Sequence, residues 1–413
     1  MSVIKPFLAV RPKKEYAAEV AALPYDVMNS AEARAAAAGK PYSFLHVDKA
    51  EIDLPLDTDL YADAVYAKAA ENLQKLLSDG ICFREDREKL YLYRQTMGKT
   101  VQTGIVGCAA VDDYVNGVIK RHELTRADKE ADRIRHVDTC NANTGPIFLA
   151  YRETAQINRV IDKYLSLAPA YDFVSDGGVR NEVWVIGDDA DIQSLVDGFR
   201  QVESLYIADG HHRAASAVKV ALKRREAHPD YTGDEEFNYF LAVYFRADEL
   251  KILDYNRLIK DTNGLSDDEL FEKLGGVFTV APSRTPVRPA HRHRFGMYYK
   301  DRWYCLDLKP GLADENDVVD SLDVSILQKL VNEPIFGIGD PRTDKRIDFV
   351  GGIRGLEELE KRCHEDMTLA FSMYPTSLSE LMDIADSGRI MPPKSTWFEP
   401  KLLSGLFIHE LDG

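Results

Sequence analysis

Five consecutive residues in the stretch LYIADGHHRAASA (205–217) have side chains suited to chemistry on an anion. They are Asp209, Gly210, His211, His212 and Arg213. Arginine offers phosphate oxygens a planar, permanently charged fork, and histidines donate hydrogen bonds or transfer protons. Aspartate can bind a magnesium ion or accept the proton of an attacking hydroxyl group. The stretch therefore points to a phosphate-like ligand.

The segments around this stretch predict a junction between a strand and a helix. SLYIA (204–208) has the composition of a short buried strand, and 211–226 has small and apolar residues at helical spacing. Asp209 and Gly210 would lie where the helix begins, where unpartnered N–H groups and the helix dipole attract anions. The alternative is structural, because aspartate is a common N-cap and Arg213 could simply pair with a carboxylate.

A second group of polar residues lies upstream, between 118 and 148. His122 and Glu123 follow a strand-like segment, and Asn143 precedes a Thr-Gly-Pro turn. Glu123 is the candidate general base or, with Asp209, metal ligand, and His122 and Asn143 are candidate substrate or phosphate ligands. The alternative is that 123–135 forms a solvated helix with ion pairs between successive turns.

A third group lies in MPPKSTWFEPKLLSG (391–405). Two prolines stiffen the backbone ahead of Lys394, Ser395 and Thr396, which could present an ammonium and two hydroxyl groups to a phosphate. The alternative is a surface loop with an ordinary lysine. His291 and His293 predict no metal pair, because no acidic or cysteine partner is near in sequence.

The usual nucleotide-binding and hydrolase motifs are absent. The chain has no G-x-x-x-x-G-K-[ST] loop, no G-x-G-x-x-G after a strand, no H-R-D loop and no G-x-S-x-G elbow. A ligand held mainly by its phosphates, such as pyrophosphate or ADP, is therefore as reasonable a donor as ATP.

Composition indicates a globular chain of more than one average domain. It has 413 residues, of which 45% are hydrophobic and 29% are charged. Its 52 basic and 68 acidic residues give a net charge of -16, which disfavours nucleic acid as a partner and favours a small-molecule substrate. A composition break at DTNGLSDDE (261–269) divides the chain into a catalytic core, 1–260, and an α+β region, 261–413.

The periodicity predicts an α/β fold with mixed sheets. A hairpin is expected around Gly98-Lys99, and a helix over 59–79. Further strands are expected at 147–152, 182–187, 204–208, 238–245, 295–300, 302–308 and 367–374. Further helices are expected near 127–139, 154–166, 189–200, 211–226, 266–274, 320–331, 355–364 and 376–387.

The cysteines and the N-terminal residues indicate a cytoplasmic protein. The five cysteines show no C-x-x-C pair and no regular spacing, so neither a disulfide framework nor a zinc site is expected. The first residues contain no apolar signal segment, and no run of eighteen apolar residues suggests a membrane span.

Several motifs together make the chain resemble the DUF1015 family over nearly its full length. They are PFLAVRP (6–12), ALPYDV (22–27), PYSFLHVDKAEIDLP (41–55), RHELT (121–125), NANTGPIFLAY (141–151), IADGHHR (207–213) and MPPKSTWFEPKL (391–402). The DGHHR stretch also resembles the signature of free serine kinases of the ParB/sulfiredoxin-like superfamily. The resemblance implies a ParB/sulfiredoxin-like core with additional N- and C-terminal elements.

The resemblance also implies an activity, the phosphorylation of free L-serine to O-phosphoserine with magnesium and ATP, ADP or pyrophosphate as donor. Asp209 would correspond to the catalytic aspartate, and His211, His212 and Arg213 would contact the transferred phosphate. Glu123 is the candidate for the kinases' upstream catalytic glutamate, although its local sequence is not a strict match. The alternatives are a phosphoserine-type phosphohydrolase and a non-catalytic ParB-like nucleotide-binding regulator.

Overall fold

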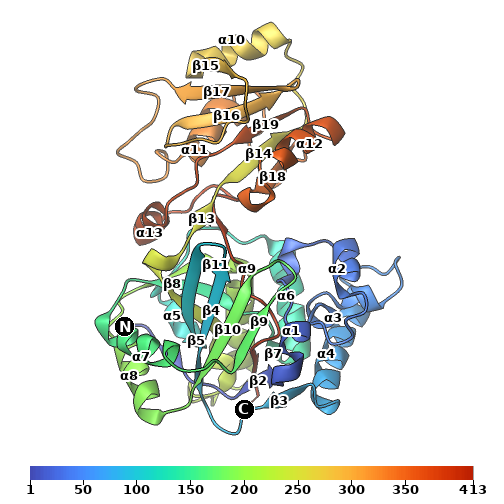
Figure 1. Cartoon of the computed structure of the whole chain (residues 1–413), viewed down its shortest axis with the longest axis vertical. Helices are drawn as coiled ribbons and strands as arrows, with labels where there is room; N and C mark the ends of the chain where they lie inside the picture. The colour runs from blue at the N-terminus through green and yellow to red at the C-terminus, as the bar shows by residue number, and fades with distance from the viewer. Residues whose placement is uncertain (413) are drawn as a thin grey trace. The chain divides into compact units, whose positions relative to one another are not determined.

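The computed structural model describes residues 1–412, and these form two compact units (Figure 1). The first unit comprises 1–121, 125–250 and the segment from Pro400 onward, and the second comprises 122–124 and 251–399. The division thus falls between Leu250 and Lys251, whereas the sequence placed it after residue 260. The chain also returns to the first unit at Pro400, which the sequence division 1–260 and 261–413 does not include.

The first unit is built on a nine-stranded mixed sheet. Its strands are β1 (Ile4–Lys5), β4 (Leu90–Met97), β5 (Thr100–Ala110), β6 (Ile119–Lys120), β8 (Ile147–Tyr151), β9 (Tyr171–Val174), β10 (Arg180–Ile186), β11 (Leu205–Asp209) and β12 (Tyr239–Arg246). The strand order is β6-β11-β8-β12-β5-β4-β10-β9, and β1 pairs with β5. β11 runs parallel to β6 and antiparallel to β8, so β11 lies next to the edge strand β6.

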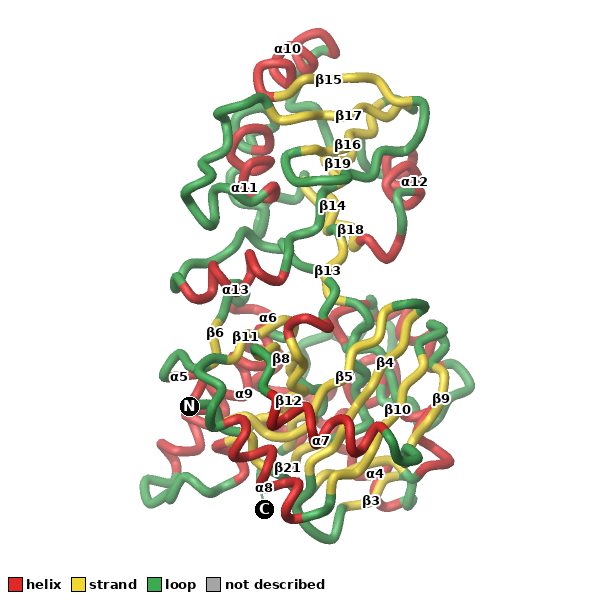
Figure 2. Tube along the Cα trace, turned by 60° about the vertical axis from the view of Figure 1, so that its left-hand side comes forward, coloured by secondary structure: helices red, strands yellow, loops and turns green. Residues whose placement is uncertain are grey.

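Four helices of the first unit bury apolar residues against this sheet, and they are α5 (Val111–Val115), α7 (Ala155–Leu165), α8 (Asp189–Phe199) and α9 (His211–Ala227). A fifth, α6 (Ala127–Cys140), packs on α9. α7 and α8 lie side by side (Figure 2). Ile157 and Leu195 on these two helices join Ile207 of β11 and Ala214 of α9 in one hydrophobic core. This shared core fixes where β11 ends and α9 begins.

A smaller layer of the first unit combines four short strands with helices. The strands, in the order β3-β2-β21-β7, are β2 (Ala9–Pro12), β3 (Cys82–Arg84), β7 (Ala142–Asn143) and β21 (Ile408–Glu410). The helices are α1 (Ala17–Val20), α2 (Ser30–Ala37), α3 (Leu45–Asp48) and α4 (Asp63–Ser78). Phe44, Leu73 and Ile408 belong to the core of this layer, so residues near both ends of the chain hold it together.

The second unit is built on a six-stranded antiparallel sheet. Its order is β15-β17-β16-β19-β14-β18, with β14 (Tyr255–Ile259), β15 (Phe278–Ser283), β16 (Arg294–Tyr299), β17 (Arg302–Leu308), β18 (Ile347–Gly351) and β19 (Leu369–Ser372). A separate pair joins β13 (Ile252–Leu253) to β20 (Trp397–Phe398). The helices are α10 (Asp267–Val277), α11 (Asp323–Leu327), α12 (Glu357–Glu365) and α13 (Leu378–Asp386). Leu359 of α12 packs on Leu258 and Ala370 of the sheet.

The predicted fold class, α/β with mixed sheets, is confirmed, and the ParB/sulfiredoxin-like core stays a prediction. The hairpin of β4 and β5 and the long helices α4, α6 and α9 form where the sequence placed them. Over residues 1–412, no helix combines the length and the apolar character needed to cross a bilayer. All five cysteines are free thiols, as expected.

Candidate functional site

The junction between β11 and α9 depends on one glycine. Gly210 separates the two elements and has a φ of 92° and a ψ of 30°, in the left-handed region that glycine adopts without strain. A Cβ atom on Gly210 would also lie 3.2 Å from Cζ of Arg213. Two independent restrictions therefore make a larger residue unfavourable at this position.

Asp209 does not cap the helix. The N-cap residue of α9 is Gly210, which has no side chain to cap the helix. The pairing of β11 with β8 shifts register between Ile207 and Asp209, an irregularity that redirects side chains. Oδ2 of Asp209 accepts a hydrogen bond from Nη2 of Arg213 at 3.0 Å, and Oδ1 lies 3.4 Å from Nζ of Lys401. The carboxylate thus binds two cations, and the start of α9 has no side-chain cap.

Arg213 is fixed by contacts on several sides. Its side chain is 10% exposed, and its Nη1 donates to the backbone oxygen of Pro146. Burial by itself would lower the pKa of Arg213, but the negative charges of Asp26 and Asp209 raise it above its usual value. The guanidinium is therefore a permanent, positioned charge in the first turn of α9.

Lys401 is the functional candidate that the sequence analysis missed. Its side chain is 8% exposed, and its backbone oxygen accepts a hydrogen bond from Nε2 of Gln95 at 2.9 Å. Gln102 binds the preceding carbonyl, that of Pro400, at 3.1 Å. Two glutamines of the central hairpin thus anchor the segment that brings the ammonium group to Asp209. The only signal in the sequence was its position within the MPPKSTWFEPKL motif.

The electrostatics of the junction depend on two buried cations and the carboxylates around them. Burial alone would raise the pKa of Asp209, but Lys401 and Arg213 hold it well below its usual range. Asp209 is therefore ionised at neutral pH and pairs with both cations, while the negative charges of Asp26 and Asp48 also act on Arg213. The N-terminal end of α9 adds a partial positive charge.

Three other sequence motifs meet beside Arg213 of the DGHHR stretch. Tyr25 of ALPYDV, Asp48 of PYSFLHVD and Thr144 of NANTGP line a cavity of about 20 Å³ together with Arg213 and Arg133. Oγ1 of Thr144 donates to Asp48 at 2.8 Å, and the guanidinium of Arg133 lies 4.1 Å from the centre of the Tyr25 ring. A cavity of this size holds about one water molecule. These residues therefore pack around Arg213, and the cavity between them is too small for a substrate.

The two histidines of the DGHHR stretch differ in their surroundings. His211 is buried, with 5% of its surface exposed. His212 is partly exposed, and its Nε2 accepts a hydrogen bond from the backbone N–H of Arg126 at 3.0 Å. Accepting this bond requires an unprotonated Nε2, so in this geometry the His212 ring is neutral and tethers the start of α6.

Asn143, a sequence-predicted ligand, makes contacts that hold strands together. Its side chain is buried at β7, and Oδ1 accepts from the backbone N–H of Leu241 at 3.2 Å and lies 3.1 Å from Nδ1 of His409. These contacts connect β7 with β12 and β21. Asn143 therefore has a structural function, which is to connect these strands. Its predicted function as a ligand stays a prediction.

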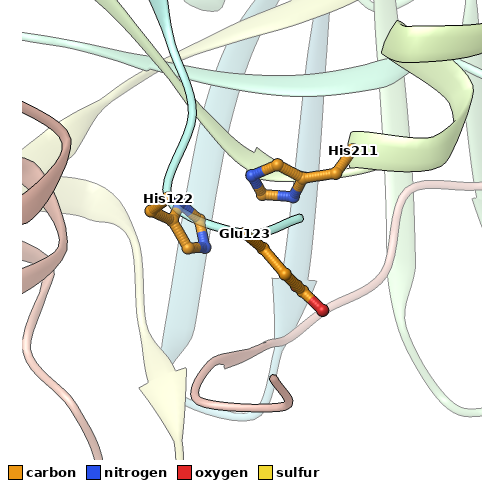
Figure 3. Close-up of side chains that lie close together, drawn as sticks. All are labelled: His122, Glu123 and His211. Atoms are coloured by element: carbon orange, nitrogen blue, oxygen red, sulfur yellow. The ribbon is translucent and has the colours of Figure 1, made fainter. Parts of the chain in front are cut away.

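His122 and Glu123 belong to the second unit, although residues 121 and 125 on either side belong to the first. Figure 3 draws both side chains, which come from the loop after β6, together with His211 from the start of α9. The backbone oxygen of His122 accepts from Met391 at 2.8 Å, and its Nε2 lies 3.5 Å from Oγ1 of Thr396. Glu123 lines a cleft of the second unit.

The predicted trio Lys394, Ser395 and Thr396 also belongs to the second unit. Oγ of Ser395 donates to the backbone oxygen of Pro392 at 2.6 Å, so this hydroxyl closes the local turn. Lys394 is exposed, has a φ of 60°, and its Nζ lies 5.9 Å from the centre of the Tyr255 ring. The ligand functions of the three residues stay predictions.

The fold and the junction define an α/β protein with two buried cations around a carboxylate at a helix N-terminus. The sequence matches the family described as "Protein of unknown function (DUF1015)" over residues 4–325. The chain belongs to this family, which confirms the resemblance stated from the motifs. A comparison with curated proteins finds no match.

Several solved structures are similar to the chain at low identity. A free serine kinase in complex with AMP shares 12% identity with a TM-score of 0.39, covering 75% of this chain and 91% of that one. A mutant free serine kinase in complex with AMP shares 14% identity with a TM-score of 0.39, covering 75% and 92%. A conserved hypothetical protein from Pyrococcus furiosus shares 15% identity with a TM-score of 0.36, covering 75% and 96%.

Proposed function

We propose that the chain is a phosphotransferase that moves a phosphoryl group to the hydroxyl group of a small molecule. The observation that carries this proposal is the β11–α9 junction, where Asp209 positions two buried cations beside an uncapped helix N-terminus. Phosphoryl transfer requires mainly positioning and neutralisation of phosphate charge, and this junction supplies both. Free L-serine is the acceptor that the resemblance to serine kinases implies, with ATP, ADP or pyrophosphate as donor.

In the proposed reaction, the hydroxyl oxygen of the acceptor attacks the terminal phosphorus of the donor. The bond from that phosphorus to the leaving phosphate or nucleotide breaks, and the electron pair stays with the leaving group. Arg213, Lys401 and the N–H groups of α9 neutralise the charge on the phosphate oxygens. The hydroxyl proton passes to a carboxylate base.

Asp209 suits the positioning of the cations better than it suits the acceptance of that proton. A general base works best with a pKa near the operating pH, and the pKa of Asp209 lies far below it. Glu123 therefore stays the candidate base, as the sequence indicated. His122, Lys394, Ser395 and Thr396, which also belong to the second unit, stay candidate ligands.

The surroundings of Asp209 do not fit a magnesium ligand. One of its oxygens contacts Arg213 and the other contacts Lys401. A divalent cation on this carboxylate would lie next to two positive charges, which opposes its binding. We therefore derive no step through a magnesium ion held by Asp209, and the donor's own phosphates are the natural ligands for that ion.

The test is a direct assay of O-phosphoserine formation. The protein is incubated with L-serine, magnesium and each of the three donors in turn, and the product is measured by mass spectrometry. Asp209→Asn should lower kcat by about 100-fold, the scale of losing one positioned charge in such a site. The control is Asp189→Asn, whose side chain is 89% exposed.

Three outcomes of this assay would change the proposal. If no donor yields O-phosphoserine, L-serine is not the acceptor. If a parallel incubation with O-phosphoserine and no acceptor releases inorganic phosphate, the protein is a phosphohydrolase. If Asp209→Asn keeps full turnover, the junction is not the site of transfer.

A further inference from the structure

The second unit contains a cleft of about 450 Å³. Apart from Glu123, none of its lining residues takes part in the proposed phosphoryl transfer. A volume of this order is typical of sites for small organic molecules. The cleft is bounded by the Pro-rich segment 390–393, by α11 and by the π-helical turn Gln328–Asn332. Single π-helical turns occur often at functional sites.

The buried part of the cleft lining is apolar with one polar exception. Val319 and Met391 are 9% and 3% exposed, and Pro392 and Pro393 extend the apolar surface. Ser325 also lines the cleft and is 2% exposed. Among the described residues, Oγ of Ser325 has no hydrogen-bond partner. Oγ is enclosed by the surrounding residues, so a ligand reaches it only when the cleft lining shifts. An unpaired buried hydroxyl is unfavourable, and a ligand that bonds to Ser325 in this way would recover the loss.

The exposed part of the lining carries charges of both signs. Lys329 pairs with Asp320 at 2.5 Å, and Arg342 pairs with Asp340 at 2.9 Å. The Lys329 and Arg342 side chains are 55% and 45% exposed. With Glu123, the lining has three acidic and two basic groups, which opposes a polyphosphate. A ligand head group with one positive and one negative charge matches this mixture best.

We propose that the cleft binds a free amino acid in its zwitterionic form, with an apolar side chain that ends in a hydrogen-bonding group. The ammonium and carboxylate groups contact the charged residues at the exposed part of the cleft. The apolar side chain packs on Met391 and the two prolines, and its terminal polar group bonds to Ser325. L-Tyrosine has all three features and is the probe.

The test is isothermal titration calorimetry on the full-length protein with no phosphoryl donor present. L-Tyrosine should bind about tenfold more tightly than L-phenylalanine, the worth of one hydrogen bond to an otherwise unpaired buried group. Tyramine and 3-(4-hydroxyphenyl)propanoate each lack one charge of the zwitterion and should bind at least tenfold more weakly than L-tyrosine. These comparisons use only the wild-type protein, so they do not depend on the folding of a variant.

Two variants locate the binding in this cleft. Ser325→Ala should remove the preference for tyrosine over phenylalanine, and Lys329→Met should weaken both amino acids equally. The control Ser379→Ala, at an exposed position of α13, should change neither. Absence of binding by both amino acids, or an unchanged tyrosine preference in folded Ser325→Ala, would overturn the proposal. Because no donor is present, neither result depends on whether the protein phosphorylates serine.

Discussion

Replacing Lys401 by methionine tests whether the two cations around Asp209 form a functional site. The substitution keeps a long apolar side chain and removes the charge 3.4 Å from Oδ1 of Asp209. At an effective dielectric constant of about 20, two unit charges at this distance attract each other by about 5 kcal/mol. The loss of this attraction in the variant is partly offset, because folding no longer removes the hydration of a buried ammonium group. In addition, Arg213 continues to neutralise Asp209.

The expected net effects follow from this balance. The free energy of unfolding of Lys401→Met should fall by about 2 kcal/mol, and kcat/KM for O-phosphoserine formation should fall by about 100-fold. The pKa of Asp209 should rise toward its ordinary value. Affinity for pyrophosphate, measured by calorimetry, should fall in parallel with kcat/KM, because the missing charge neutralises phosphate.

A lysine on the surface of α9 provides the control for Lys401. Lys223→Met removes a lysine of α9 whose side chain is 65% exposed. It should change the free energy of unfolding by no more than about 0.5 kcal/mol and should leave kcat/KM unchanged. Lys401→Arg should restore part of the activity, because it restores the charge with a different shape. Wild-type turnover and pyrophosphate affinity in Lys401→Met would refute the assignment of Lys401 to the phosphate site.

Two further substitutions test single features of the structure. Gly210→Ala should lower the free energy of unfolding by about 1–2 kcal/mol and weaken pyrophosphate binding, because alanine is strained at a φ of 92° and its Cβ would displace Arg213; chemical denaturation and calorimetry measure both effects. Asp323→Asn tests a buried carboxyl group whose pKa burial raises to about 6. Because this pKa exceeds the unfolded value of about 3.9, the contribution of Asp323 to the wild-type free energy of unfolding should be highest below pH 4 and should be lost as the pH rises through 6. The variant should lack this contribution, so its stability relative to the wild type should be about 2 kcal/mol higher at pH 8 than at pH 4. Denaturation curves that show the same difference between variant and wild type at both pH values would contradict the burial argument.

Elements with strong periodicity could be predicted from the sequence, and short elements could not. The apolar spacing of α4 and α9 and the strand composition around Gly98-Lys99 are local signals, and the structure confirms all three. β7, β20 and β21 have two or three residues each, too few for a periodic pattern. Their pairing depends on partners far away in the sequence, such as His409 opposite Asn143.

The candidate site shows the same limit. The sequence could place Asp209, Gly210 and Arg213 at one junction because they are adjacent in the chain. It could not select Lys401, which is 192 residues from Asp209, and it indicated the nearby Lys394 instead. It could not show that Tyr25 and Asp48 support Arg213, since only the folded layer of α1–α4 brings those motifs together.

The return of the chain to the first unit at Pro400 has a consequence for biosynthesis. A ribosome makes the DGHHR stretch long before it makes Lys401, so Asp209 first folds beside a single cation. β21, which joins β2 to β7, is likewise made after that stretch. A nascent chain that stops short of residue 400 can therefore form the β11–α9 junction but lacks the second cation beside Asp209. Under the proposed function, the capacity to bind pyrophosphate should appear only after Lys401 has been made.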